Sequence, residues 1–284
     1  MFKILDTYEL GPRMHYVLMD APLIARKAQA GQFVIIRVSE KGERVPLTIA
    51  DYDRVKGTVT LVFQEAGKTT CALGAMKKGD FLHDLLGPQG NPTEIEKFGH
   101  AVVIGGGIGV APVYPLARAL KGKGNKVTSI IGYRSRDHIF WEDRMKAVSD
   151  TLIIATNDGS YGKKGFVTDM LKGLIDAGEK IDIVFAIGPA VMMKAVCDMT
   201  RTARLKTIVS LNSLMVCGMG MCGACRVSVA NKTKFTCMDG PDFDGHQVDF
   251  ALLMKRLETY KPEECSCQGT LGSDPKQLRR DSWR

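Results

Sequence analysis

Apolar residues in the first hundred positions of the chain come in short runs separated by glycines and charged turns. The runs cover residues 16–19, 32–38, 47–49 and 59–63, and most of them are rich in β-branched and aromatic residues. Short runs bounded by turns in this way are typical of an antiparallel sheet or barrel. We therefore expect residues 1–98 to form a small antiparallel β barrel.

From residue 100 the pattern changes to apolar runs that alternate with helical stretches. The runs lie at residues 101–104, 127–133, 152–155 and 183–187. Strands that alternate with helices predict a parallel sheet with right-handed crossovers, which is the usual support for a nucleotide. Residues 99–205 are therefore expected to form an α/β nucleotide-binding domain.

The composition shifts once more after Arg201, first to a cysteine-rich segment and then to a charged one. We expect residues 206–264 to form a small C-terminal lobe with an extension. Residues 265–284 lack apolar periodicity and are expected to be a flexible tail. The chain of 284 residues thus predicts a β barrel, an α/β parallel-sheet domain and a small C-terminal lobe.

Charge and composition narrow the classes of partner. The net charge of +8 suits nucleic acid, an acidic protein or phosphorylated ligands. Because only 7% of residues are aromatic and no nucleic-acid motif occurs, we expect no nucleic-acid partner. The start of the chain has no apolar signal region, and no segment approaches the ~18 apolar residues of a membrane span. We expect a cytoplasmic protein without a membrane partner.

The eight cysteines are expected to remain thiols or thiolates, since no export signal is visible. Four of them, Cys217, Cys222, Cys225 and Cys237, have the C-x4-C-x2-C…C spacing of a [2Fe–2S] ligand set. The interleaved glycines let the backbone wrap around a cluster and aim N–H groups at its sulfurs. These four cysteines are our predicted metal ligands.

A structural zinc site with four cysteine ligands is the alternative reading of this segment. Such sites more often show paired C-x2-C motifs, and only one such motif occurs here. If zinc were bound, the chain would be a zinc-stabilised nucleotide-binding scaffold without turnover.

Glycine-containing loops follow three of the predicted parallel strands. The candidate nucleotide-binding residues in them are Gly106, Gly107, Gly109, Pro112, Asp158, Gly188 and Pro189. Glycines between a strand and a helix let a phosphate or nicotinamide approach the helix N-terminus. Loops at the carboxyl ends of parallel strands line the ligand crevice of such a sheet, although each alone could be a plain turn.

The barrel segment holds two further candidate cofactor-binding sequences. The first contains Arg44, Pro46, Leu47 and Thr48, and the second contains Gly67, Lys68, Thr69 and Thr70. A cation beside a strand and a loop of small residues both suit a pyrophosphate. From the residues alone, ordinary structure explains either sequence better than cofactor binding does.

Together these parts resemble the ferredoxin–NADP reductase superfamily over residues 1 to about 262. Residues 44–48 are similar to its R-x-P-[LI]-[ST] flavin strand, residues 67–70 to its pyrophosphate loop, and residues 107–112 to its G-x-G-x-x-P nucleotide turn. The cysteine lobe is similar to that of subunits with FAD and one [2Fe–2S] cluster. This resemblance implies FAD, NAD(H) and a cluster as cofactors.

Two groups of subunits share that lobe. One is the electron-transfer subunit of dihydroorotate dehydrogenase, and the other is the small subunit of NADH-dependent reduced ferredoxin:NADP oxidoreductase, also described as sulfide dehydrogenase. Residues 210–216, 239–250 and 254–264 resemble the second group more closely. Two positions depart from the expected pattern, since Cys217 replaces a frequent aspartate of that group and Ile187 replaces a frequent cysteine of the superfamily.

The resemblance implies an electron-transfer subunit that exchanges hydride with NAD(H) at FAD and passes single electrons through the cluster. The chain has no motif for a [4Fe–4S] cluster, so we expect a heterodimer with a larger flavin and [4Fe–4S] subunit, and ferredoxin reached through that complex. No acid–base side chain is needed, and we name no catalytic residue. Arg134 and Arg136 would suit NADP, whereas Asp137, Glu142 and Asp158 favour NAD; the resemblance favours NAD.

Overall fold

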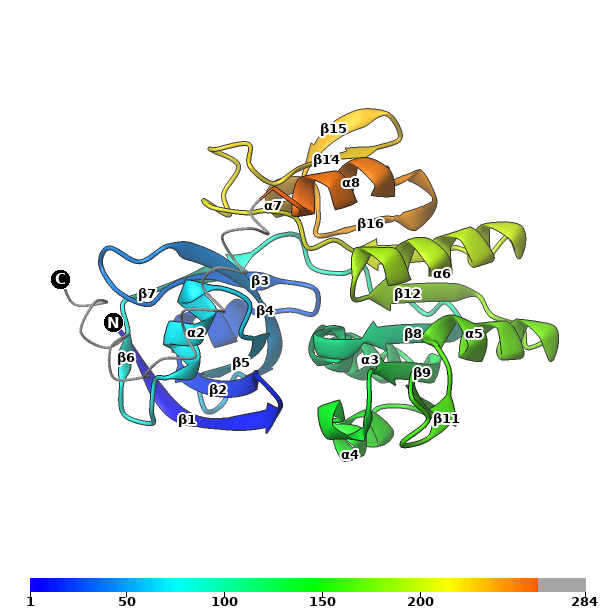
Figure 1. Cartoon of the computed structure of the whole chain (residues 1–284), viewed down its shortest axis with the longest axis horizontal. Helices are drawn as coiled ribbons and strands as arrows, with labels where there is room; N and C mark the ends of the chain where they lie inside the picture. The colour runs from blue at the N-terminus through cyan, green and yellow to red at the C-terminus, as the bar shows by residue number, and fades with distance from the viewer. Residues whose placement is uncertain (260–284) are drawn as a thin grey trace.

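The computed structural model describes residues 1–259, in three parts that follow the order of the chain. Figure 1 shows the barrel in blue and cyan, the parallel-sheet domain in green, and the C-terminal lobe in yellow and orange against both. The expected fold class is therefore confirmed. The expected tail at 265–284 lies outside the described residues.

The first sheet has the strand order β6-β1-β2-β5-β4-β3-β7 and is antiparallel throughout. Its strands are β1 (Phe2–Gly11), β2 (Met14–Asp20), β3 (Phe33–Arg37), β4 (Arg44–Asp53), β5 (Thr58–Gln64), β6 (Phe81–Leu82) and β7 (Asp84–Gln89). The two edge strands, β6 and β7, are neighbours in sequence, so the sheet curls into a nearly closed barrel. Helices α1 (Pro22–Lys27) and α2 (Lys68–Gly74) connect its strands.

The second sheet has the order β11-β10-β9-β8-β12-β13-β16, in which only β16 is antiparallel to its neighbour. Its strands are β8 (His100–Gly106), β9 (Lys126–Tyr133), β10 (Thr151–Thr156), β11 (Lys163–Lys164), β12 (Ile183–Ile187), β13 (Thr207–Ser210) and β16 (Asp242–Asp244). The helical segments are η1 (Gly107–Gly109), α3 (Val110–Gly122), η2 (Arg136–His138), α4 (Glu142–Ala147), α5 (Val167–Asp176) and α6 (Ala190–Thr202).

Strand β8 lies in the middle of this sheet and is buried on both faces. Ala101 and Val103 pack in the core with α3, while Val102 and Ile104 pack in the core with α5 and α6. Helices therefore cover both faces of the sheet, as the continuous apolar run of β8 requires.

The C-terminal lobe begins after β13. It contains the hairpin β14 (Arg226–Val229) and β15 (Lys232–Phe235), then α7 (Thr236–Asp239), η3 (Gly245–Gln247) and α8 (Phe250–Leu257). The expected boundary at residue 205 does not coincide with a structural break, because β13 pairs with β12 and β16 returns to pair with β13. The cysteine-rich segment is thus inserted between two strands of the nucleotide sheet.

Among residues 1–259, no helix is long and apolar enough to cross a membrane.

Candidate functional site

The loops after β8 and β12 meet at the point where the strand order of the parallel sheet reverses. Strand β9 follows β8 on one side, whereas β12 and β13 continue on the other. A Cβ atom added to Gly109 would lie 2.3 Å from the Ile187 carbonyl oxygen, and one added to Gly188 would lie 3.2 Å from the Gly106 Cα. Open α/β sheets bind ligands where the strand order reverses, and only glycine permits this approach of two backbones.

Helix α3 begins directly after this loop and places Pro112 in its first turn. Pro189 lies beside Gly106, since its Cδ would be 3.3 Å from an added Cβ. The structure therefore brings together six predicted nucleotide-binding residues, namely Gly106, Gly107, Gly109, Pro112, Gly188 and Pro189.

Asp158 does not join this group. It follows β10, which lies beyond β9 from the crossover point, and its N–H donates to the Arg134 carbonyl. Its Oδ1 accepts hydrogen bonds from the Ser160 N–H and hydroxyl, which lower the pKa of the carboxyl. Asp158 is thus near the loop that holds Arg134 and Arg136.

The flavin-strand candidates lie on β4, opposite β3. Arg44, Pro46 and Thr48 pair with Arg37, Ile35 and Phe33 respectively. Because directly opposed residues point to the same side of a sheet, these six side chains share one face of the barrel. Leu47 instead packs against the barrel core, so its side chain faces away from the other three candidates.

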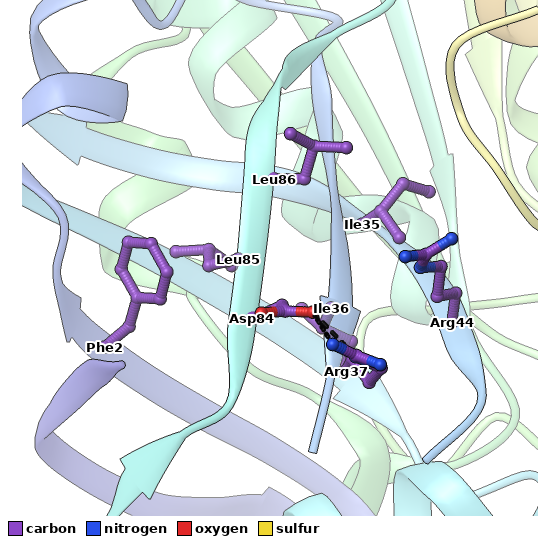
Figure 2. Close-up of a pocket in the computed structure, with 8 residues that line it drawn as sticks. All are labelled: Phe2, Ile35, Ile36, Arg37, Arg44, Asp84, Leu85 and Leu86. Carbon is purple, nitrogen blue, oxygen red and sulfur yellow. Dashed lines mark hydrogen bonds and ion pairs between the residues drawn. The ribbon is translucent and has the colours of Figure 1, made fainter. Parts of the chain in front are cut away.

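Arg44 is an exposed cation that makes no ion pair with another residue of the described part of the chain. Its cross-strand neighbour Arg37 is neutralised by Asp84, with 2.6 Å between Nη2 and Oδ2. Figure 2 shows Arg44 directed away from that pair. Arg44 lines a hollow of about 220 Å³ together with Ile35, Leu85 and Leu86. Because Asp84 already pairs with Arg37, the charge of Arg44 is left available for a bound anion.

The small-residue loop at 67–70 lies close to Arg44. The Thr69 hydroxyl donates to Glu43, the residue before Arg44, over 3.2 Å. The Thr70 hydroxyl accepts from the Gly67 N–H and donates to the Gly67 carbonyl, so it caps α2. The structure thus shows a capping role for Thr70 and places the loop beside Glu43 and Arg44.

The four predicted ligand cysteines gather in one loop and form two pairs. The Cys225 and Cys237 sulfurs are 3.2 Å apart, and Cys217 accepts hydrogen bonds from the backbone and side chain of Cys222. Within residues 1–259, no three His, Cys, Asp or Glu side chains converge on a single metal position. A [2Fe–2S] cluster takes two protein ligands on each iron, so two pairs of sulfurs fit this group.

Backbone N–H groups surround the sulfurs, as the interleaved glycines predict. Burial opposes ionisation of Cys217, but the N–H groups of Met219, Cys222 and Met221 outweigh it and lower the pKa of the thiol to about 6. Burial raises the pKa of Cys237 to about 12, and the close contact with the Cys225 thiol adds to this rise. Cys217 is therefore poised as a thiolate, while Cys237 must lose its proton when a metal binds.

The cysteine loop packs on the strand that pairs with the flavin-strand candidates. Phe33 and Ile35 of β3 form one apolar cluster with Met215, Cys225 and Cys237. The linker after the barrel reinforces this contact, because the Asn91 side chain donates to the Met238 carbonyl (2.9 Å) and the Thr93 hydroxyl donates to Asp242 (2.5 Å). Neither Asn91 nor Thr93 belongs to a sequence motif, so their contacts could not be predicted from the sequence.

Comparisons with known proteins agree with this geometry. A family model described as the iron–sulfur cluster binding domain of dihydroorotate dehydrogenase B matches residues 212–249, and an oxidoreductase NAD-binding domain matches residues 103–198. FAD, NAD(H) and a [2Fe–2S] cluster are the cofactor set that these domains and the fold support.

Three relatives cover most of the chain. A Thermotoga maritima homologue of the dihydroorotate dehydrogenase B (NAD(+)) electron transfer subunit is 46% identical over 87% of this chain and 86% of its own. The corresponding subunit of Shouchella clausii is 38% identical over 86% and 92%. A solved structure of an NADH-dependent reduced ferredoxin–NADP oxidoreductase is 41% identical, covers 95% of this chain and 98% of its own, and has a TM-score of 0.90.

The expected resemblance is therefore confirmed at the level of the family. The chain belongs to the family of dihydroorotate dehydrogenase B electron transfer subunits and their homologues, which are NAD(P)H-linked iron–sulfur flavoprotein oxidoreductase subunits.

Proposed function

We propose that this chain moves electrons between NAD(H) and a larger flavoprotein in a flavin-based electron-bifurcating NADH-dependent ferredoxin:NADP oxidoreductase. The observation that carries the proposal is that the flavin-strand candidates and the cysteine loop both contact β3. One of its edges pairs with β4, which holds Arg44 and Thr48, and its outer face packs against the loop that holds the four cysteines. Neighbouring flavin and cluster sites are what one-electron transfer between them requires.

Each cofactor has its own residues in this proposal. Arg44 and the loop at 67–70 would bind the FAD pyrophosphate, while Pro46 and Thr48 would fix the ring. Two pairs of cysteines, Cys217 with Cys222 and Cys225 with Cys237, would hold the two irons. When bound, FAD supplies the exchange between hydride transfer and single-electron transfer, and the chain's own residues position the groups.

NAD(H) would bind across the crossover point between β8 and β12. Gly107 leaves room for the nucleotide before α3, Gly109 lets the loop pack on the Ile187 carbonyl, and Gly188 and Pro189 close the other side. Around the loop after β9, Tyr161 donates to Glu142 (3.0 Å to each oxygen), which keeps a carboxylate close to Arg136. This acidic group supports NAD over NADP.

The partner is proposed to be a larger subunit with flavin and [4Fe–4S] clusters. The bifurcating reading is supported by the match to the solved ferredoxin–NADP oxidoreductase chain, which extends over nearly its full length. The runner-up function is electron transfer to a dihydroorotate dehydrogenase, which the names of the Thermotoga and Shouchella relatives favour.

Anaerobic purification of the tagged chain from its native cells, followed by mass and metal analysis of the bound subunit, tests the choice. We expect a larger iron-rich flavoprotein, and a complex that reduces ferredoxin only when NADPH and NAD are both supplied. A dihydroorotate-oxidising subunit would establish the runner-up. An isolated chain that NADH cannot reduce would contradict both functions.

A further inference from the structure

We propose that Asp51 is a positioning residue that fixes the flavin strand relative to the nucleotide loop. The inference rests on the proposed FAD and NAD(H) sites, although the contact itself does not depend on either cofactor. It goes beyond them because Asp51 touches neither site and belongs to no motif of the chain.

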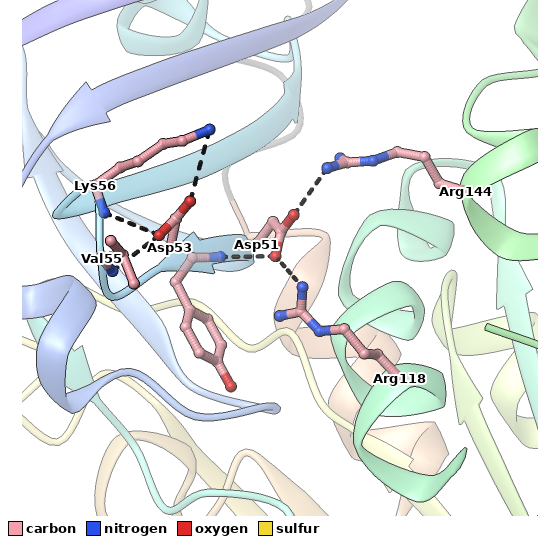
Figure 3. A network of polar contacts seen from close by, with 7 residues as sticks. Asp51, Asp53, Val55, Lys56, Arg118 and Arg144 are labelled. Carbon is pink, nitrogen blue, oxygen red and sulfur yellow. Dashed lines mark hydrogen bonds and ion pairs between the residues drawn. The ribbon is translucent and has the colours of Figure 1, made fainter. Parts of the chain in front are cut away.

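Asp51 joins the barrel to the nucleotide domain through both of its carboxylate oxygens. Arg118 of α3 donates to Oδ1 over 2.7 Å, and Arg144 of α4 donates to Oδ2 over 2.8 Å. Figure 3 shows the two guanidinium groups reaching the carboxylate from the other domain. The Asp51 side chain is only 14% exposed, so this contact is screened less than an ordinary surface ion pair.

A β-bulge aims Asp51 at the other domain. Along β4, Ile49 and Asp51 pair with consecutive β5 residues, Leu61 and Thr60, so Ala50 is an extra residue. Ile49 packs inside the barrel, and in a regular strand Asp51 would point the same way. The bulge instead turns Asp51 outward, next to Ala50, which packs in the core cluster of α3. Bulges commonly re-aim a side chain close to a functional site.

Two rigid elements connect this contact to the proposed cofactor sites. Asp51 lies three residues after Thr48 on β4, a span of about 10 Å. Arg118 lies nine residues after Gly109 along α3, a span of about 14 Å. A shift at the ion pair is therefore transmitted to the flavin strand on one side and to the nucleotide loop on the other.

Aromatic rings hold the two arginines in place on the nucleotide side. Tyr114 lies within 5.3 Å of the Arg118 guanidinium and 4.7 Å of that of Arg144, and Trp141 lies 4.4 Å from Arg144. The cations are thus pre-organised, and Asp51 is the acidic group that the barrel supplies. Barrel residues Met14 and Val62 also pack in the core cluster of α3, so loss of this carboxylate would shift the two domains relative to each other without separating them.

Asp51→Asn tests the proposal because it keeps the shape of the side chain and removes its charge. Asp150→Asn is the matched control, since Asp150 pairs with Lys121 at the same 2.7 Å but within the nucleotide domain. Asp51→Glu is the conservative variant that retains the carboxylate. All three are compared with the wild type as the complete, cofactor-loaded chain.

Two experiments are needed. Rapid mixing with NADH gives the limiting rate of flavin reduction and the Kd for NADH. Amide hydrogen exchange reports on the stability of residues 110–122. We expect Asp51→Asn to slow the limiting rate by about ten- to a hundredfold with little change in Kd, because a displacement near 1 Å has effects of this size. Its exchange over residues 110–122 should rise. Asp51→Glu should restore most of the wild-type limiting rate. Asp150→Asn should keep the wild-type limiting rate, although its thermal stability should be lower.

An unchanged rate in Asp51→Asn, or an equal loss of rate in Asp150→Asn, would overturn the positioning role. If NADH does not reduce even the wild-type flavin, the proposed function fails instead. In that case hydrogen exchange alone decides this inference, and identical exchange in Asp51→Asn and the wild type would overturn it.

Discussion

The backbone of Gly218 packs directly on the side chain of Ile35, so closely that an added Cβ would lie 2.5 Å from the Ile35 Cγ1 atom. Gly218 follows the first predicted ligand, Cys217, whereas Ile35 lies opposite Pro46 of the flavin strand. The contact therefore joins the cysteine loop to the barrel at the strand that both proposed redox sites share.

Gly218→Ala should reduce the iron and acid-labile sulfide content per chain. The new methyl group would clash with Ile35, and Gly218 also has a positive φ of 71°, which costs about 1 kcal/mol for a residue with a side chain. Gly223→Ala is the control, because Gly223 has a similar φ of 68° but its added Cβ would lie 3.7 Å from the nearest atom. Equal cluster content in the two variants would contradict the packing argument.

Arg44→Gln should weaken FAD binding by at least about tenfold, since a hydrogen bond to a charged group contributes about 1.5–3 kcal/mol. The flavin-free variant should be no less stable than the wild type, because the Arg44 side chain is exposed and its neighbour Arg37 already pairs with Asp84. Flavin retained after dialysis and the melting temperature of the flavin-free chain are the measurements. A large drop in that melting temperature would indicate a structural role for Arg44.

Gly109→Ala should raise the Kd for NADH by about tenfold, because the backbone must shift to remove a contact with the Ile187 carbonyl, and overpacking of this kind costs about 1–3 kcal/mol. Gly122→Ala serves as the control, since an added Cβ at Gly122 meets no atom within 4 Å. Titration of both variants with NADH gives the comparison. Unchanged affinity in Gly109→Ala would place the nucleotide elsewhere.

Cys225→Ser should abolish the iron–sulfur absorption bands, since one iron would lose a thiolate. Cys197→Ser should keep them, because Cys197 is buried among α6 and β13 residues, and burial raises the pKa of its thiol to about 12. Iron content and visible spectra of the two purified variants check this. Loss of the bands in both variants would mean that the four-cysteine assignment is incomplete.

Local patterns in the sequence were sufficient to predict several buried strands of both sheets and the loop that holds four cysteines. Every apolar run expected as a strand lies within or overlaps an observed strand, because burial on one or both faces of a sheet leaves a clear periodicity. The ten-residue strand β1 was not among the expected runs, since charged and polar residues interrupt its apolar positions. The cysteine spacing anticipated a loop in which all four sulfurs gather.

Relationships between distant segments could not be read in the same way. Asp51 and Arg144 are separated by 93 positions in the sequence. The bulge that directs Asp51 toward Arg144 depends on the register of β4 with β5. Strand β16 pairs with β13 although the cysteine segment separates them in the sequence, and this pairing has no sequence signature. Asp158 was grouped with the nucleotide loops because its strand was expected to end at the same edge, but the sequence did not reveal the strand order that separates it from Gly109.

The most direct test of the central claim is an anaerobic visible spectrum of the purified chain, recorded before and after NADH, with iron, sulfide, zinc and flavin analysis. The account predicts about two irons, two sulfides and one FAD per chain, with absorption bands that NADH bleaches. A colourless chain that holds one zinc ion and no flavin would contradict it.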